Sequence, residues 1–260
     1  MSELVHTDVE EGVAHIRLNR PEVLNVLDVE LARAFCERVA LAANDPSVRV
    51  IVMSGEGRSF CAGGDLAYFR GAQDRGQAAH RLIEPIHRAV MILASARQPV
   101  IASVQGVAAG AGASLIFAAD LAIAAEDAGL NLAYVNVAAT PDCSASWSLP
   151  RLVGLRKAME IALLGERIEA SEALRLGLFN RVVPTGALED ETRKLAQRLS
   201  RAAPLALQGI KRLMRESLNR TLQEQLAAEQ LSFASGAATE DFHEALEAFF
   251  ARRPPHFSGR

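Results

Sequence analysis

The first 125 residues alternate between short apolar runs and longer amphipathic stretches. Val13–Leu18 alternates apolar and polar side chains, which predicts a strand, and Pro21 follows it with no N–H to give to a strand ladder. Asp28 can cap a helix that runs to about Asn44. We expect one face of this helix to be apolar, formed by Leu31, Phe35, Val39 and Leu41.

Three further runs are almost entirely apolar and predict strands of a sheet that is covered on both faces. They are Val48–Met53, Val100–Val104 and Leu121–Ala125. Helices are predicted between them, over residues 77–96 and 113–119. Alternation of strands and helices is typical of an α/β core.

From Gly154 onward the pattern becomes helical. The short apolar segment Arg181–Val183 is the one interruption that we expect to be extended. We therefore predict a core over residues 1–195 and a C-terminal helical region over residues 196–260. The predicted helices of this half of the chain cover residues 155–164, 170–176, 188–201, 204–217, 221–235 and 239–252.

Composition excludes several classes of protein. The net charge of -3 gives no general attraction to nucleic acid or to an anionic membrane. No apolar run reaches the roughly 18–20 residues that a membrane span needs, and the N-terminus lacks the apolar core of a signal peptide. Cys36, Cys61 and Cys143 are too widely spaced to suggest a disulfide framework or a zinc site. We expect a soluble cytoplasmic protein without a metal.

Two glycine-rich loops are the first candidates for chemistry. Residues 59–66 (SFCAGGDL) follow a predicted strand, and residues 106–113 (GVAAGAGA) open a predicted helix. Small residues let a ligand approach the backbone, and free N–H groups at a helix start favour negative charge. Each loop also has a structural interpretation, as a tight turn or as close helix packing.

Dinucleotide binding and the common hydrolase motifs do not fit this sequence. Gly110 and Gly112 match two glycines of G-x-G-x-x-G, but Leu115 stands at the third, and no acid follows about 20 residues later. Among the acids between residues 106 and 150, Asp142 is unusual because it follows Pro141 in an otherwise apolar stretch. A carboxylate there is costly unless it is used, although Asp142 could also cap the next helix.

Several motifs in order resemble the crotonase, or enoyl-CoA hydratase/isomerase, superfamily. They are LNRPEVLNVLD, GRSFCAGGDL, QGVAAGAGASL, PDCSASWSLPRLVG and FFARRPPHFSGR. The resemblance covers nearly the whole chain. It implies a ββα-spiral core with a C-terminal helical region that builds homotrimers, often paired into hexamers. It also implies an acyl-coenzyme A thioester as substrate, so that coenzyme A enters with the substrate and no separate cofactor is needed.

The resemblance also implies site residues. The amides of Ala62 and Ala111 match the two donors of an oxyanion hole, which would hold the thioester oxygen. A second group would contact coenzyme A or the acyl chain, with the last two members supplied by a neighbouring subunit. This group comprises Leu24, Gly63, Gly64, Asp65, Leu66, Tyr134, Trp147, Phe249 and Arg252.

The sequence departs from the hydratases of the family at two positions. Those enzymes carry two glutamates, and here Ser114 and Tyr134 stand in their places. Asp142 lies where the Δ3,Δ2-enoyl-CoA isomerases carry their working acid, and its surroundings are similar to the phenylacetate-pathway isomerases that act on a ring-epoxide. One carboxylate can move a proton between two carbons, whereas water addition normally needs a second group. The resemblance therefore favours an isomerase.

Three alternatives remain open at this point. Asp142 could be a nucleophile, as in the related 4-chlorobenzoyl-CoA dehalogenases, with His80 near that family's histidine, although His80 also suits an ordinary helix surface. Asp142 could instead serve a hydratase together with an unrecognised group. A non-catalytic scaffold or RNA-binding role lacks the basic residues interleaved with aromatics that RNA binding would need.

Overall fold

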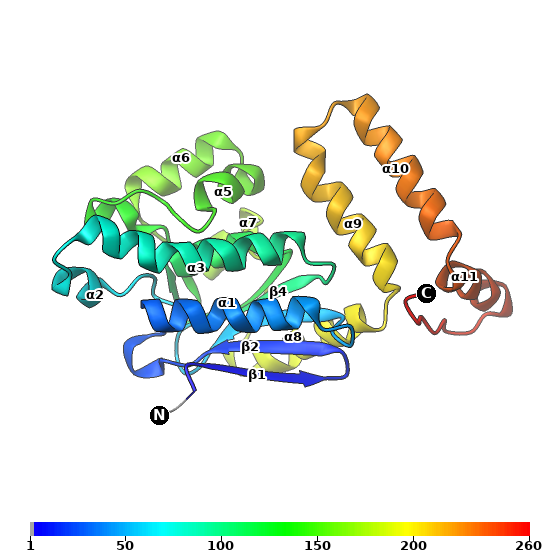
Figure 1. The fold of residues 1–260 in the computed structure, drawn as a ribbon, viewed down its shortest axis with the longest axis horizontal. Helices are drawn as coiled ribbons and strands as arrows, with labels where there is room; N and C mark the ends of the chain where they lie inside the picture. The colour runs from blue at the N-terminus through cyan, green and yellow to red at the C-terminus, as the bar shows by residue number, and fades with distance from the viewer. Residues whose placement is uncertain (1–2) are drawn as a thin grey trace.

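The computed structural model describes residues 3–260 and contains a six-stranded sheet at its centre (Figure 1). The strand order is β1-β2-β3-β4-β6-β9. The pair β1 and β2 is antiparallel, and all other neighbours are parallel. Its strands are β1 (Val5–Glu10), β2 (Val13–Leu18), β3 (Val50–Gly55), β4 (Val100–Val104), β6 (Leu121–Ala125) and β9 (Arg181–Val183).

A second, three-stranded sheet carries the loops that follow the main strands. Its order is β5-β7-β8, and its strands are β5 (Val107–Ala109), β7 (Gly129–Asn131) and β8 (Arg167–Glu169). A parallel bridge between Cys61 and Ala108 joins the first glycine loop to this sheet. The sequence did not predict these three strands, because each has three residues and is stabilised by pairing with distant segments.

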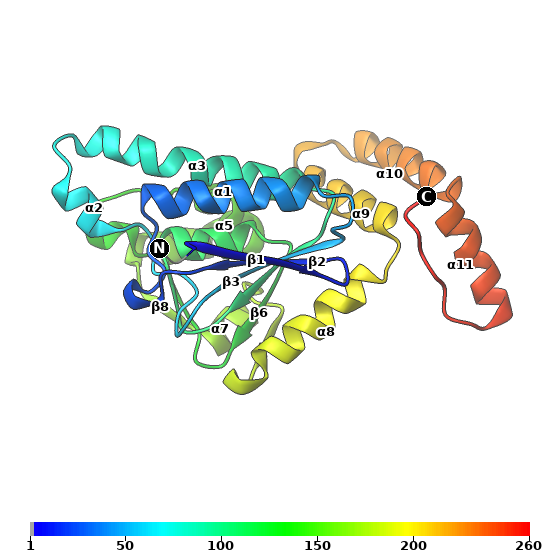
Figure 2. The same cartoon turned by 60° about the horizontal axis from the view of Figure 1, so that its bottom comes forward.

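Helices cover both faces of the main sheet. Figure 2 shows α1 and α3 on one side and α8 on the other. The helices of the core are α1 (Val29–Asn44), α2 (Leu66–Gly71), α3 (Arg75–Ser95), α4 (Ala111–Ala118), α5 (Ala145–Val153), α6 (Leu155–Leu164), α7 (Ala170–Arg175) and α8 (Leu188–Ser200). Short 3-10 turns connect several of them: η1 (Pro21–Val23), η2 (Ala133–Val137) and η3 (Thr185–Ala187).

The apolar face predicted for α1 is correct except at one position. Leu31, Phe35 and Val39 are buried, and the Asp28 carboxylate accepts from the Leu31 amide at 2.8 Å as a helix cap. Leu41, however, is 62% exposed, because it lies two residues beyond Val39 and so faces away from the sheet. Helices α2 and α5 were not predicted; α2 has only six residues, and α5 contains Pro150.

The C-terminal region consists of helices that extend away from the core (Figure 1). They are α9 (Pro204–Glu216), α10 (Leu222–Ala237) and α11 (Glu240–Ala251), with the turn η4 (Ser217–Asn219) between α9 and α10. The expected boundary at residue 195 falls inside α8, where Leu195 and Ala196 pack on the main sheet. The change of architecture therefore comes after Ser200.

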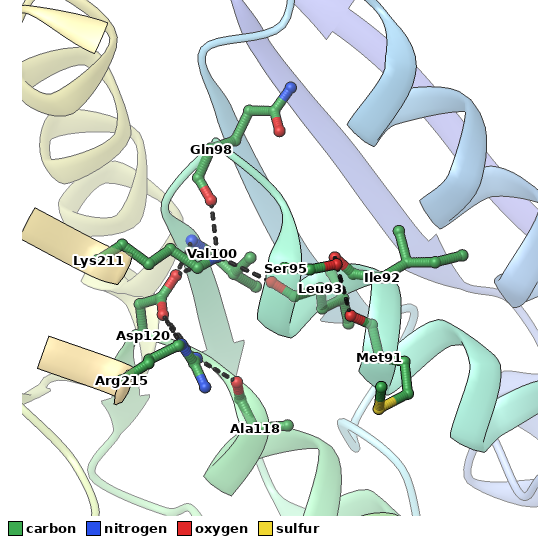
Figure 3. Close-up of polar contacts among 10 residues, drawn as sticks. All are labelled: Met91, Ile92, Leu93, Ser95, Gln98, Val100, Ala118, Asp120, Lys211 and Arg215. Carbon is green, nitrogen blue, oxygen red and sulfur yellow. Dashed lines mark hydrogen bonds and ion pairs between the residues drawn. The ribbon is translucent and has the colours of Figure 1, made fainter. Parts of the chain in front are cut away.

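A buried ion cluster holds α9 on the core (Figure 3). The Lys211 ammonium donates to the carbonyls of Leu93 and Gln98 at 2.8 and 2.9 Å, and lies 2.9 Å from Asp120 Oδ2. Arg215 binds Asp120 Oδ1 at 2.6 Å. Burial lowers the pKa of Lys211, and the charge of Asp120 opposes that shift. Asp120 is thus a structural acid.

Within residues 3–260, none of the helices combines the length and apolar character that crossing a bilayer requires.

Candidate active site

The buried side chain of Asn25 fixes the shape of the first glycine loop. Its Nδ2 donates to the carbonyls of Glu56, Ser59 and Phe60 at 2.9, 2.8 and 3.2 Å. Its Oδ1 accepts from the Arg20 amide at 2.8 Å. Asn25 has a φ of 56°, a conformation that asparagine adopts more readily than most residues. Sequence reasoning missed this residue, although an asparagine after a Pro-containing turn could have signalled it.

The amide of Ala62 does not fit the role that the resemblance gave it. It donates to the Leu24 carbonyl at 3.0 Å, so it is already satisfied. Leu24 itself lies in the left-handed region, with a φ of 59°, which presents its carbonyl to this loop. The prediction for Ala62 is therefore wrong, and Leu24 positions the loop through its backbone.

The neighbouring amide of Gly64 is the free donor of this loop. Gly64 forms a parallel bridge with Leu27, in which the Leu27 amide donates to the Gly63 carbonyl at 2.7 Å and the Asp65 amide donates to the Leu27 carbonyl at 2.9 Å. These bonds leave the Gly64 N–H without an acceptor in the described part of the chain. An unpaired, half-buried amide is suited to binding an oxyanion.

The second free donor is the amide of Ala111. Helix α4 begins at Ala111, and the first amides of a helix have no acceptor within it. The preceding Gly110 amide is bound to the Asn131 carbonyl at 2.8 Å, whereas that of Ala111 has no acceptor among residues 3–260. The helix dipole adds to its attraction for negative charge. Ala111 is thus free for the role that the resemblance implies.

Glycines allow the two loops to touch. At Gly63, whose φ is 97°, an added Cβ would lie 2.9 Å from the Ala109 carbonyl oxygen and 3.7 Å from the Ala111 nitrogen. At Gly112 an added Cβ would lie 2.1 Å from the Cys61 carbonyl oxygen. Both distances to oxygen are shorter than real Cβ contacts, so the two backbones pack without side chains between them. The free amides of Gly64 and Ala111 consequently lie on adjoining segments.

A chain of hydrogen bonds connects the second loop to Asp142. Ser114 is fully buried, and its hydroxyl lies 3.0 Å from both the Gly110 carbonyl oxygen and the Tyr134 hydroxyl. The Tyr134 hydroxyl donates to Asp142 Oδ1. Burial, together with the charge of Asp142, raises the pKa of Tyr134 above its usual range, so the phenol stays protonated. The structure thus brings together Asp142 and the two positions, Ser114 and Tyr134, that distinguished this sequence from the hydratases.

Asp142 does not act as a helix cap. The cap residue of α5 is Ser144, and Asp142 contributes only its backbone carbonyl, which accepts from the Ala145 amide at 3.0 Å. From α3, the His87 ring accepts a hydrogen bond from the Cys143 amide at 3.1 Å, through Nε2. His87 was not predicted from the sequence. His80, which was considered, lies two turns earlier on α3 and is exposed.

Trp147 is not brought into this site. It is 42% exposed on α5, stacks on Arg151, and lines a cleft between α5 and α9 together with Phe117 and Lys211. The lining of this cleft includes none of Ser114, Tyr134 and Asp142, so the structure does not bring Trp147 together with them. The apolar stretch before Asp142 is exposed in this chain, at residues 135–140.

The remaining residues that were predicted to contact coenzyme A lie in two places, at the end of the first glycine loop and at the end of the last helix. Asp65 caps α2 by accepting from the Ala67 amide at 2.9 Å, and it pairs with Arg20 at 3.5 Å, so its carboxylate has a structural use. Leu66 is exposed at the start of α2. Phe249 and Arg252 are exposed at the end of α11, on the far side of the chain from α2 (Figure 1). Within one chain they cannot contribute to this site.

Taken as chemistry, the site combines two main-chain donors with one carboxylate. The donors can hold an oxygen that becomes negative, and the carboxylate can take a proton from a neighbouring carbon. Such an arrangement is suited to stabilising an enolate.

Comparisons with known proteins agree with this interpretation. The enoyl-CoA hydratase/isomerase family model matches residues 8–260, and the chain belongs to this family, also called the crotonase superfamily. It is 36% identical over 265 residues to the 1,2-epoxyphenylacetyl-CoA isomerase of Escherichia coli, with 100% of each chain covered. It is 35% identical over 260 residues to the 2,3-dehydroadipyl-CoA hydratase of the same organism, again with 100% of each covered.

Solved structures share the whole fold. The crystal structure of enoyl-CoA hydratase from Bacillus anthracis has a TM-score of 0.94 and 31% identity, covering 99% of this chain and 100% of that one. The predicted spiral α/β core with its C-terminal helices is confirmed. Relatives named as isomerases and as hydratases are similar to this chain to nearly the same degree, so the reaction has to be argued from the site.

Proposed function

We propose that the protein is an acyl-CoA isomerase that shifts a double bond, or opens a ring-epoxide, next to a thioester. The observation that supports this proposal most directly is the series of hydrogen bonds from Ser114 through Tyr134 to Asp142, in which one carboxylate is accompanied by two hydroxyls. A serine or tyrosine hydroxyl is too weak a base to activate water near neutral pH, and burial raises the pKa of Tyr134 further. Asp142 is then left as the base of the reaction.

The mechanism needs one proton and no external electron acceptor. With a 3-enoyl-CoA, Asp142 removes a proton from the α carbon, and the electron pair moves onto the thioester oxygen. The amides of Gly64 and Ala111 hold this oxyanion; one such donor is typically worth about 10²–10³ in rate. Asp142 then returns the proton to the γ carbon, which leaves a 2-enoyl-CoA. Coenzyme A serves as the handle of the substrate, and the reaction calls for no redox cofactor.

A substrate panel in deuterated solvent tests this function. We expect turnover of 3-enoyl-CoA, with deuterium appearing at the α or γ carbon of the product because the carboxylate exchanges its proton with solvent. Hydration of 2-enoyl-CoA and release of halide from a 4-halobenzoyl-CoA should be at least about tenfold slower, since each needs a group other than one proton shuttle. Mass spectrometry and chromatography follow all three reactions. Hydration as the fastest of the three would refute the proposal.

We also propose that the chain assembles into trimers or hexamers. Helices α10 and α11 leave large apolar side chains exposed, and a monomer rarely exposes so many together. They include Leu222, Leu226, Leu231, Phe233, Phe249 and Phe250. In such an assembly Phe249 and Arg252 could reach a neighbour's substrate.

Light scattering checks the assembly. We expect a mass of three or six times 27.9 kDa at micromolar concentration. Phe249→Ser together with Phe250→Ser should lower that mass, because it removes two exposed aromatic rings from the proposed interface. A stable monomer of the unaltered chain would contradict this proposal.

A further inference from the structure

We propose that Tyr134 is a positioning residue for Asp142, with its hydroxyl oriented by Ser114. In this arrangement Tyr134 engages Oδ1 of the carboxylate with a hydrogen bond and leaves Oδ2 to carry the proton. The inference rests on the proposed function in one respect, that Asp142 is the base of the reaction. The hydrogen bonds of Tyr134 and Ser114 do not depend on that function.

The first step concerns the direction of the hydrogen bonds. The Tyr134 hydroxyl has two polar neighbours, Ser114 Oγ at 3.0 Å and Asp142 Oδ1. An ionised carboxylate can only accept, so the phenol proton points to Asp142 when that group is charged. The Tyr134 oxygen then faces the Ser114 hydroxyl, whose one proton has two acceptors at 3.0 Å, this oxygen and the Gly110 carbonyl. The Gly110 carbonyl also accepts from the Ser114 amide at 3.0 Å, so it keeps a donor when the hydroxyl turns to Tyr134.

The second step concerns rigidity. Ser114 is completely buried in the first turn of α4, and Tyr134 is only 9% exposed in η2. The Tyr134 ring also packs on the second loop, since a Cβ added at Gly110 would lie 3.9 Å from its Cζ atom. A donor held this firmly fixes the orientation of the carboxylate that it faces, and with it which oxygen remains available.

The third step concerns the other ionisable groups around Asp142. Cys143 is next to it, Cys61 lies on the first loop, and His87 comes from α3. Burial raises the pKa of both thiols, so both are neutral near pH 7. The His87 ring is engaged with the Cys143 amide, which donates to it. The neutral Cys143 thiol also hydrogen-bonds Asp142, but a thiol is a weak donor, so Tyr134 is the stronger of these two donors to the carboxylate.

The readout follows from these contacts. A donor that orients the carboxylate should affect the proton transfer and leave thioester binding alone, so its removal should lower kcat and leave KM nearly unchanged. A role in packing alone would change KM and the melting temperature as well.

The experiment measures kcat and KM for 3-enoyl-CoA, and the melting temperature, with the full-length enzyme and its variants. In Tyr134→Phe we expect kcat to fall by about tenfold, the scale of a hydrogen bond to a charged group, while KM changes by less than about twofold. Ser114→Ala should lower kcat by less, no more than about fivefold, again with KM nearly unchanged. Ser103→Ala is the matched control, because Ser103 is also buried and its hydroxyl lies 2.9 Å from that of Thr192, on another face of the sheet.

The outcomes separate this inference from the proposed function. An unchanged kcat in Tyr134→Phe, with Asp142→Asn inactive, overturns the positioning role and leaves the isomerase standing. A fall of kcat of equal size in Ser103→Ala also overturns the role, because the effect would then be general. If Tyr134→Phe does not fold, the kcat and KM of Ser114→Ala decide in its place. Full activity of Asp142→Asn would instead refute the proposed function.

Discussion

Asp142→Asn should lower the turnover of 3-enoyl-CoA by at least about 10²-fold, the lower range for the loss of general-base catalysis. The substitution keeps the size of the side chain. Its amide oxygen can still accept from the Tyr134 hydroxyl, as Oδ1 does now. What disappears is the group that removes and returns the proton. Steady-state kinetics at a fixed pH near 7 measure the effect.

Two controls show that the loss is chemical. Calorimetry with acetoacetyl-CoA should give nearly the same affinity for both proteins, because the amides of Gly64 and Ala111 are untouched. The free acid acetoacetate should bind neither, since it lacks coenzyme A. If Asp142→Asn keeps full activity while Ser114→Ala abolishes it, the single-carboxylate isomerase is the wrong mechanism.

Gly112→Ala should reduce activity by about 10²-fold while the chain still folds. The added methyl would lie 2.1 Å from the Cys61 carbonyl oxygen, which is backbone and cannot rotate away. Helix α4 must therefore move from the first loop, and the amide of Ala111 moves with it. A displacement of about 1 Å in a catalytic group can cost 10²-fold in rate, and overpacking costs about 1–3 kcal/mol of stability.

Kinetics and thermal unfolding together measure this second effect. Gly186→Ala provides the control, because a methyl there would meet nothing within 4 Å and Gly186 has no positive φ. It should leave both activity and melting temperature close to those of the unaltered protein. Normal turnover in Gly112→Ala would mean that the contact between the loops does not set the position of the donor.

Periodicity predicted the long elements well because their packing depends on their own side chains. Strands β2, β4 and β6 and helices α6 and α9 fall where the apolar pattern placed them, within about one residue. The free amide of the first loop could not be predicted in this way. Whether Ala62 or Gly64 is satisfied depends on the carbonyls of Leu24 and Leu27, which are about 40 residues distant in the sequence. The family resemblance identified the first glycine loop as part of the site. Only the three-dimensional arrangement showed that its free amide is that of Gly64.

The role of a side chain could be predicted where its residue type is unusual for its surroundings in the sequence. It could not be predicted where the role depends on which backbone group the side chain meets in the fold. Asp142 was conspicuous as a carboxylate after Pro141 in an apolar stretch. Asn25 and His87 are common residues whose roles come from the backbone groups that they meet, three carbonyls in one case and the Cys143 amide in the other. Trp147 lies on α5, a helix that the sequence did not reveal, and lines another cleft.

The Cys61–Ala108 bridge has a consequence for how such a site can diversify. It is formed by the Cys61 amide to the Val107 carbonyl at 3.3 Å and the Ala109 amide to the Cys61 carbonyl at 3.0 Å. The free amides of Gly64 and Ala111, the proposed oxyanion donors, thus lie on two main-chain segments that these hydrogen bonds join directly. Mutation can alter the side chains around these segments, and with them the acyl groups accepted or the acid employed, without dismantling the charge-binding element. If the backbone is inherited and only a few side chains change, descendants of one ancestral site can catalyse different reactions.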